Sequence, residues 1–201
     1  MLLRSHLLLA IAWMAFCGLH SLLAADSVKQ KIVPLLPRGA ALYRLLYTLF
    51  AAAGFIAVVY YQLFLRSVRL FHPRLPVLIA GIAGGLIGAA IMGICIARYF
   101  FLLSGLKGLL KSDARPVLLQ SGLHRYVRHP LYMGTFIFIW ALFLLVPLLS
   151  LGISNTIITV YTIIGARLEE RKLVKTFGTM YVQYRQRVPM FIPWLASGQQ
   201  G

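Results

Sequence analysis

Long apolar segments alternate with short basic segments along the chain. They predict five membrane helices, at roughly residues 6–25, 41–65, 76–103, 131–146 and 149–165. A helix needs about 20 apolar residues to cross the hydrocarbon core, so the first three segments are long enough for single crossings. The last two are shorter and are joined at Pro147 by an uncharged turn, which makes them a hairpin. The pattern therefore predicts an all-α integral membrane protein.

After Gly165 the pattern changes to that of an amphipathic helix. Apolar side chains recur there at helical spacing: Leu173, Phe177, Met180, Tyr181 and Tyr184. Basic residues lie on the opposite face, as in helices that rest in the membrane interface. Gly178 is the weakest position of this helix, and an apolar tail follows over residues 188–194. We expect a hairpin followed by an interfacial amphipathic helix.

Glycines recur in the third apolar segment with the spacing of closely packed helices. Gly81 and Gly85, and likewise Gly84 and Gly88, are four residues apart. Small residues at this spacing let two helix backbones approach each other in a membrane. A phosphate-binding glycine loop would need a strand–turn–helix context, which is absent from this apolar segment. We expect close helix packing here.

Composition agrees with a membrane protein and argues against a nucleic-acid partner. The chain is 60% hydrophobic and 12% charged, whereas soluble domains average about 25% charged residues. A net charge of +16 could suggest nucleic acid. The basic residues lie between apolar segments, however, where anionic lipid headgroups and the positive-inside rule explain them. We expect the lipid bilayer as partner and no nucleic acid.

The first apolar segment resembles a signal peptide in its position and in the small residues at its end. It is long for the apolar region of a signal peptide, and it contains Trp13 and His20. We therefore interpret it as an uncleaved first helix. Cys17 and Cys95 lie far apart in apolar segments, a pattern that indicates buried small residues and no disulfide or metal site.

The distribution of Lys and Arg predicts the orientation of the hairpin. The turn between its two helices has neither residue, while Arg125 and Arg128 precede the hairpin and Arg171 and Lys172 follow it. The positive-inside rule then places both flanking segments, and any site between them, in the cytoplasm. Arg66, Arg69 and Arg74 fall on the opposite side in a five-helix arrangement. This conflict concerns the first three helices only.

Two adjacent glutamates are the most informative polar feature. Glu169 and Glu170 are half of the four acidic residues, against 20 Lys and Arg, and both border the apolar stripe of the amphipathic segment. Because the hairpin folds back on itself, we expect both glutamates to lie close to Arg128 and His129. They could simply pair with arginines, but exposed ion pairs contribute little to stability. Ionisable groups at a membrane boundary indicate function, so we expect the pair to bind a cationic ligand.

The histidines before the fourth helix do not form a metal site. His124 and His129 have no further Cys, Asp or His at usable spacing, so no zinc site is expected. His129 precedes Pro130 at the start of the helix and can hydrogen-bond a ligand. Tyr132, one turn further, is the expected pocket residue, whereas Tyr126 fits the interfacial aromatic belt.

These residues also carry a family resemblance. Arg-His-Pro-Leu-Tyr at 128–132, Glu-Glu at 169–170, Phe-Gly-x-x-Tyr-x-x-Tyr at 177–184 and Val-Pro at 188–189 occur in this order around the hairpin. The combination resembles the C-terminal half of the isoprenylcysteine carboxyl methyltransferase superfamily, over residues 115–194. The N-terminal half, with Leu-His-Ser-Leu-Leu-Ala at 19–24, resembles the methanethiol methyltransferase and nurim-like branch.

The resemblance implies S-adenosylmethionine as the methyl donor, in a pocket closed by the C-terminal helix. Its implied cofactor contacts are Pro116, Val117, Leu118, Leu119, His124, His129, Pro130, Leu131, Tyr132 and Glu169. The donor's positive charges add Glu170 as an expected contact, and we expect Arg128, His129 and Arg167 as catalytic residues. Two positions depart from the family pattern. The families usually carry tyrosine at the position of His124, and the arginine that binds substrate in the prenylcysteine enzymes aligns with Gly165.

We therefore expect one membrane domain, with N-terminal helices over 1–105 and a cofactor-binding core over 106–195. The expected function is S-adenosylmethionine-dependent methyl transfer to a lipophilic or small acceptor. A prenylcysteine carboxylate, a small thiol and a lipid amine remain open as acceptors; a thiol or amine would need His129 or His124 as base. The alternatives are a non-catalytic nurim-like scaffold and an NADPH-dependent membrane reductase of the sterol-reductase type.

Overall fold

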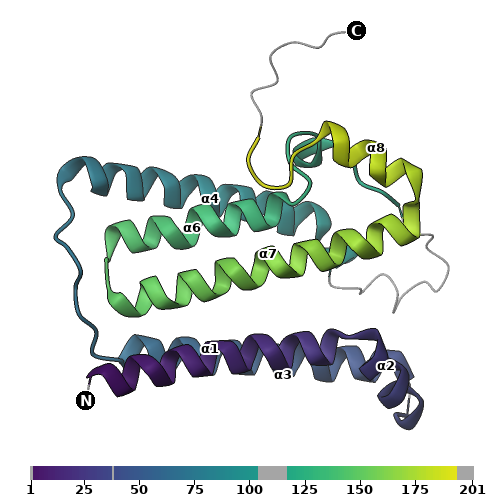
Figure 1. Ribbon diagram of the computed structural model, residues 1–201, viewed down its shortest axis with the longest axis horizontal. Helices are drawn as coiled ribbons and strands as arrows, with labels where there is room; N and C mark the ends of the chain where they lie inside the picture. Colours follow the sequence, from purple (N-terminus) through teal and green to yellow (C-terminus); the bar gives the residue numbers. More distant parts are fainter. Residues whose placement is uncertain (1, 38, 104–116, 194–201) are drawn as a thin grey trace, which may run out of the picture. The chain divides into compact units, whose positions relative to one another are not determined.

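The computed structural model describes residues 2–37, 39–103 and 117–193, and these residues are helical with short connections (Figure 1). The elements are α1 (Leu2–Ala24), α2 (Asp26–Ile32), η1 (Val33–Leu35), α3 (Gly39–Phe64), α4 (Leu75–Leu103), η2 (Gly122–Arg125), α6 (Pro130–Leu145), α7 (Leu149–Phe177) and α8 (Thr179–Arg187). The expected all-helical class is thereby confirmed for the described residues.

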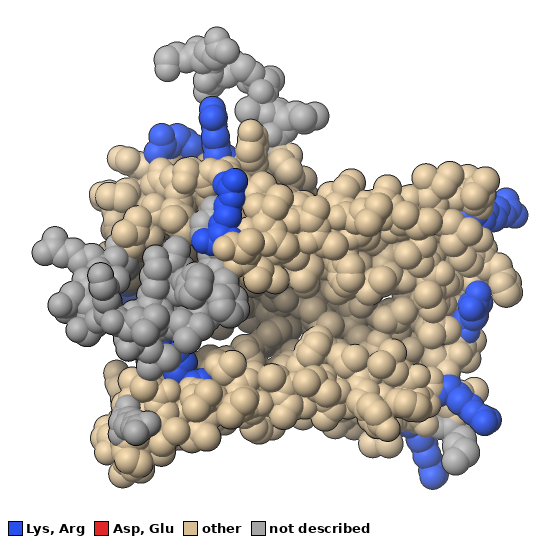
Figure 2. All heavy atoms as spheres, turned by 180° about the vertical axis from the view of Figure 1, so that it is seen from behind, with Lys and Arg blue, Asp and Glu red and all other residues tan. Residues whose placement is uncertain are grey.

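Four of these helices are long and apolar enough to cross a membrane, namely α1, α3, α4 and α7. At 16 residues, α6 is about 24 Å long, which is shorter than the ~30 Å hydrocarbon core. The expected number of five crossings therefore remains a prediction. Figure 2 shows a face that is almost entirely tan along the helices, with its Lys and Arg side chains toward their ends. This distribution suits helices surrounded by lipid.

The last long helix differs from the sequence-based expectation. We expected a helix ending near Gly165, but α7 continues without interruption through this residue to Phe177. Glycine inside a helix costs about 1 kcal/mol relative to alanine, which is less than the cost of leaving helix-end carbonyl groups unpaired in an apolar setting. The chain breaks instead at Gly178, whose φ of 57° is readily adopted only by glycine. The two glutamates therefore lie on a membrane helix and not after one.

The chain divides into two compact units. The first comprises Met1–His72 and Val146–Tyr161, and the second comprises Pro73–Leu145 and Thr162–Gly201. In the first unit, α1 packs against α3 around a core of Leu9, Trp13 and Val58 (Figure 1). In the second unit, α4 packs along α6. The helix α7 contributes its first part to one unit and its last part to the other.

Polar side chains inside the first unit are paired with one another. Gln62 accepts hydrogen bonds from the Trp13 indole at 3.2 Å and from the Ser154 hydroxyl at 2.7 Å. Further along α1, the two ring nitrogens of His20 each lie 2.8 Å from a tyrosine hydroxyl, one of Tyr47 and one of Tyr161. Such bonds between membrane helices contribute roughly 0.6 kcal/mol each. They join α1, α3 and α7 within the unit.

The turn between α6 and α7 is held by a neighbouring loop of the first unit. Leu70 N–H donates to the Pro147 carbonyl at 2.8 Å, and Leu149 N–H donates to the Val68 carbonyl at 2.9 Å. These bonds satisfy backbone groups that the helix ends leave open. The expected tight turn at Pro147 is confirmed.

In the second unit, glycines let α4 approach α6 closely. A Cβ atom on Gly88 would lie 2.7 Å from the Phe138 nitrogen, and one on Gly81 would lie 2.7 Å from the Leu145 side chain. A Cβ on Gly85, in contrast, would meet no atom within 4 Å. The expected close packing is confirmed, and its face runs through Gly81, Gly84 and Gly88.

We expect Gly88→Ala to destabilise the protein by about 1–3 kcal/mol, because the added methyl group meets backbone atoms that cannot move independently. Gly85→Ala on the same helix is the matched control and should be neutral or slightly stabilising. Unfolding in mixed micelles, followed by circular dichroism, measures both variants. Equal stability of the two would contradict the close contact.

Candidate functional site

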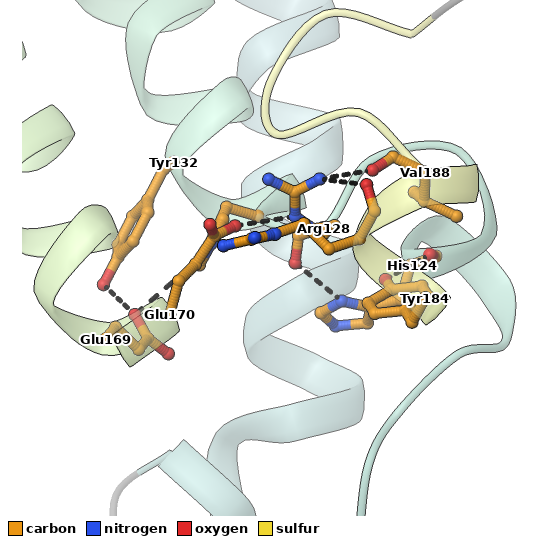
Figure 3. A network of polar contacts seen from close by, with 9 residues as sticks. His124, Arg128, Tyr132, Glu169, Glu170, Tyr184 and Val188 are labelled. Carbon is orange, nitrogen blue, oxygen red and sulfur yellow. Dashed lines mark hydrogen bonds and ion pairs between the residues drawn. The ribbon is translucent and has the colours of Figure 1, made fainter. Parts of the chain in front are cut away.

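The candidate site is built from four segments of the second unit. The 3₁₀-helix η2 and the turn after it carry His124 and Arg128, and α6 begins directly afterwards with a proline in its first turn. The last turns of α7 carry the two glutamates. Helix α8 and the residues after it complete the arrangement (Figure 3).

A buried ion pair lies at the centre of the site. The Arg128 Nε–H donates to Glu170 Oε1 at 2.6 Å, and both side chains are only 9% exposed. The Arg128 Nη1 donates to the carbonyls of Arg185 at 3.0 Å and Val188 at 2.5 Å. The same guanidinium thus neutralises the Glu170 carboxylate of α7 and binds carbonyl groups at the end of α8 (Figure 3). The Arg128 charge is therefore paired within the protein.

The backbone next to Arg128 also fastens the C-terminal segment. The N–H groups of Arg128 and His129 donate to the carbonyls of Pro189 and Met190, at 2.9 and 3.1 Å. Phe191 then lies with its ring centroid 5.2 Å from that of Phe136 and 5.9 Å from the ring of His129. The apolar tail expected after α8 therefore lies against the protein through Phe191, whereas Ile192 is 81% exposed.

The two glutamates have different environments. Glu170 Oε1, which already accepts from Arg128, lies 3.3 Å from His129 Nε2. The Glu169 side chain is 48% exposed, accepts a hydrogen bond from the Tyr132 hydroxyl at 3.1 Å and lies 3.9 Å from His129 Nδ1. The rings of His129 and Tyr132 are stacked, with centroids 5.4 Å apart and planes 10° apart. Glu170 is a structural anchor, whereas Glu169 presents an oriented carboxylate.

A cavity of about 200 Å³ lies beside Glu169. Its polar lining residues are His124, Arg128, His129, Tyr132, Glu169, Tyr181 and Tyr184, and its other lining residues are Cys95, Val117, Leu118, Leu119, Pro130, Leu131, Leu173 and Phe177. A mostly apolar concave site with a few convergent polar groups is the usual form of a small-molecule site.

One polar atom in the cavity wall has no hydrogen-bond partner among the described residues. Tyr181 is 1% exposed, and its hydroxyl meets no acceptor or donor with hydrogen-bonding geometry. Burial raises the pKa of this phenol, and the nearby Glu170 charge raises it further. Buried polar groups are nearly always paired in native proteins.

The structure brings most of the expected site residues together. Val117, Leu118, Leu119, His124, Arg128, His129, Pro130, Leu131, Tyr132 and Glu169 line the cavity. Glu170 lies behind them and contacts Arg128 and His129. Arg167 is exposed and is not part of the cavity wall. Pro116 lies outside the described residues.

Five residues that line the cavity were not predicted from the sequence: Cys95, Leu173, Phe177, Tyr181 and Tyr184. Four of them belong to the amphipathic stripe of α7 and α8, where their helical spacing with Glu169 could have indicated a shared face. Cys95 carried no such signal, because one small apolar residue in an apolar helix resembles its neighbours.

The fold and the cavity define a multi-pass helical membrane protein with a concave, mostly apolar cavity in its second unit. The family model described as NnrU protein matches residues 8–187, so the chain belongs to the NnrU family.

Similarity to characterised proteins covers a shorter part of the chain. Methanethiol S-methyltransferase 1 of Bradyrhizobium diazoefficiens is 42% identical over 77 residues, which is 37% of this chain and 26% of that protein. The methanethiol S-methyltransferase of Crocosphaera subtropica is 36% identical over 76 residues, 37% of this chain and 28% of that protein. The protein-S-isoprenylcysteine O-methyltransferase of Schizosaccharomyces pombe is 39% identical over 86 residues, 41% of this chain and 36% of that protein. Each alignment thus spans about a quarter to a third of the relative's length. No solved structure matches the chain.

We expect Glu170→Gln to destabilise the second unit by about 3–5 kcal/mol, because it leaves the buried Arg128 charge without its counter-ion. Asp26→Asn is the matched control. It removes an exposed carboxylate that pairs with Lys29 at 3.5 Å, and it should change stability by less than about 1 kcal/mol. Unfolding midpoints in detergent measure the difference. A Glu170→Gln protein as stable as the control would refute the anchoring role.

Proposed function

We propose that this protein is a membrane-embedded methyltransferase that uses S-adenosylmethionine as methyl donor. The observation that carries the proposal is the oriented carboxylate of Glu169 in the cavity wall. The named relatives, which are methyltransferases for methanethiol and for isoprenylcysteine, support the same reaction class.

The charges of the cavity suit this donor. S-adenosylmethionine carries a positive sulfonium and a positive ammonium group, and Glu169 offers a half-exposed negative charge that no arginine neutralises in the described structure. The donor's carboxylate can bind the Leu131 N–H in the first turn of α6, where Pro130 has no N–H and the Met133 N–H donates to the His129 carbonyl at 3.0 Å. Arg128 is less suited to that carboxylate, because Glu170 and two carbonyls already occupy its Nε and Nη1.

The size and lining of the cavity also bear on the ligand. Its volume of about 200 Å³ is below the ~300 Å³ of small ligand sites, so a nucleoside-sized donor would extend beyond it. Leu118, Leu119 and Leu173 give its lining an apolar part, which disfavours water. Methyl transfer is an in-line displacement, for which positioning and exclusion of water supply much of the rate enhancement.

The acceptor is small or lipophilic in this proposal and reaches the site from the bilayer or from the interface. We place the site on the cytoplasmic side, because exposed basic residues of α7 and α8 surround it: Arg167, Arg171, Lys175, Arg185 and Arg187.

We expect calorimetric titration of the purified protein in nanodiscs to detect binding of S-adenosylhomocysteine and none of NADPH. Radiolabelled S-adenosylmethionine should then methylate at least one of three test acceptors: a prenylcysteine, a short alkyl thiol or a phospholipid amine. Binding of NADPH alone would replace the proposal by a reductase, and binding of neither would favour a non-catalytic scaffold.

We expect Glu169→Gln to weaken binding of S-adenosylhomocysteine about tenfold, or roughly 1.4 kcal/mol, because it removes the charge that faces the donor's ammonium group. Asp26→Asn makes the same chemical change at an exposed position in the first unit and should leave the dissociation constant unchanged. An unaltered dissociation constant in Glu169→Gln would remove this carboxylate from the donor site.

A further inference from the structure

The last turns of α7 carry three basic side chains in a row on their outer face. Arg167, Arg171 and Lys175 are all exposed and follow one another at intervals of four residues. A helix turns about 100° and rises about 1.5 Å per residue, so the three positions lie within an arc of about 80° and extend over about 12 Å. We call these three residues the basic stripe.

The opposite side of α7 faces into the second unit. Ala166 is fully buried there, and Leu173 and Phe177 line the cavity. The centre of this inner side lies roughly 150° around the helix from the centre of the basic stripe. The stripe is therefore separate from the cavity, and Arg167 belongs to the outer face.

No described carboxylate neutralises the basic stripe. Three of the four acidic residues lie in the described part of the chain, namely Asp26, Glu169 and Glu170. Asp26 pairs with a lysine of α2, and the two glutamates contact groups around the cavity. Like charges four residues apart repel each other along a helix. An anion from outside the protein would relieve this repulsion.

The helix dipole explains only one of the three charges. Cations are favoured near the C-terminus of a helix, but the effect is confined to its last turn. Because α7 ends at Phe177, Lys175 lies in this last turn. Arg167 and Arg171 lie at least about one and a half turns before the end, so the dipole does not account for them.

The outer face of α7 becomes apolar just before the basic stripe. Ile164 is 52% exposed and Leu168 is 50% exposed. Together with the stripe they lie within an arc of about 100°, so one face of the helix carries apolar and then basic side chains. This order matches that of acyl chains and headgroups at a membrane boundary, where Lys and Arg attract anionic lipids.

We propose that the basic stripe binds the phosphate of an anionic glycerophospholipid whose acyl chains lie along Ile164 and Leu168. An arginine guanidinium matches two phosphate oxygens at once, and Lys175 adds a point charge. A zwitterionic lipid fits less well, because its own cation is repelled by the stripe. The inference is independent of the proposed methyl transfer, since it concerns the face of α7 that is turned away from the cavity.

Thermal unfolding in dodecylmaltoside micelles with added lipid tests the binding. A ligand that binds only the folded protein stabilises it, so we expect phosphatidylglycerol to raise the unfolding midpoint. Phosphatidylcholine with the same acyl chains should leave the midpoint unchanged. The stabilisation should weaken between about 0.1 and 1 M NaCl, because the Debye length falls from about 10 Å to about 3 Å. Equal stabilisation by both lipids would overturn the proposal.

Soluble anions distinguish a lipid site from a simple phosphate site. Inorganic phosphate and glycerol phosphate carry the same charged group without acyl chains. At the concentration of phosphatidylglycerol that stabilises the protein, neither should change the unfolding midpoint. A stabilisation by inorganic phosphate as large as that by the lipid would reduce the stripe to a soluble-anion site and refute the role of Ile164 and Leu168.

Replacing all three residues of the basic stripe by glutamine assigns the binding to them. Glutamine keeps the helix propensity and removes the charge. We expect the triple variant to bind the first phosphatidylglycerol at least about tenfold more weakly, as measured by native mass spectrometry of the protein released from micelles. Where the triple variant does not fold, Arg171→Gln at the centre of the stripe replaces it, and Arg171→Lys should bind more tightly than Arg171→Gln. Unchanged affinity in the glutamine variants would overturn the proposal.

The matched control removes the same charge elsewhere. Arg66, Arg69 and Arg74 are exposed in the segment between α3 and α4. Their replacement by glutamine should change the affinity for phosphatidylglycerol by less than about twofold, because attraction by a distant charge is screened by salt. An equal loss in both triple variants would mean that only the net charge of the protein attracts the lipid, and the proposal of a site on α7 would fail.

Discussion

The ion pair between Arg128 and Glu170 is the interaction on which the second unit depends. Removing two charges from water costs several kcal/mol per ion, and only short contacts and additional hydrogen bonds offset this cost. The pair has both, with a 2.6 Å contact and two carbonyls that accept from the same guanidinium. Because these groups come from three segments, their geometry specifies how the turn before α6, the end of α7 and the C-terminal segment meet.

The same pair determines the electrostatics of the cavity. Adjacent residues on a helix point about 100° apart, so Glu169 and Glu170 cannot face the same surroundings. Glu170 turns inward and pairs with Arg128, whereas Glu169 remains half-exposed at the cavity wall, 3.9 Å from His129 Nδ1. The Arg128 carbonyl, fixed by the same contacts, orients His124. One buried interaction thus assigns distinct roles to three ionisable groups.

Much of the fold could be predicted from local patterns, and the differences have physical causes. The starts of α4 and α6 and the break at Gly178 follow from proline and glycine, whose backbone restrictions act locally. The continuation of α7 through Gly165 could not be predicted in this way, since a single glycine is a weak helix breaker in an apolar environment. Likewise, the spacing of the α4 glycines predicted close packing, but only the position of α6 shows that Gly88 is in contact and Gly85 is not.

The sequence by itself determined the class of the molecule, its apolar helices and the segments that carry its polar residues. These properties follow from composition and from the periodicity of side chains along each helix. Only the tertiary structure decided which glutamate is buried and which residues line the cavity beside the other one. The contact between Arg128 and Glu170 joins residues 42 positions apart in the sequence, and hydrogen-bond geometry within a few tenths of an ångström cannot be deduced from residue order.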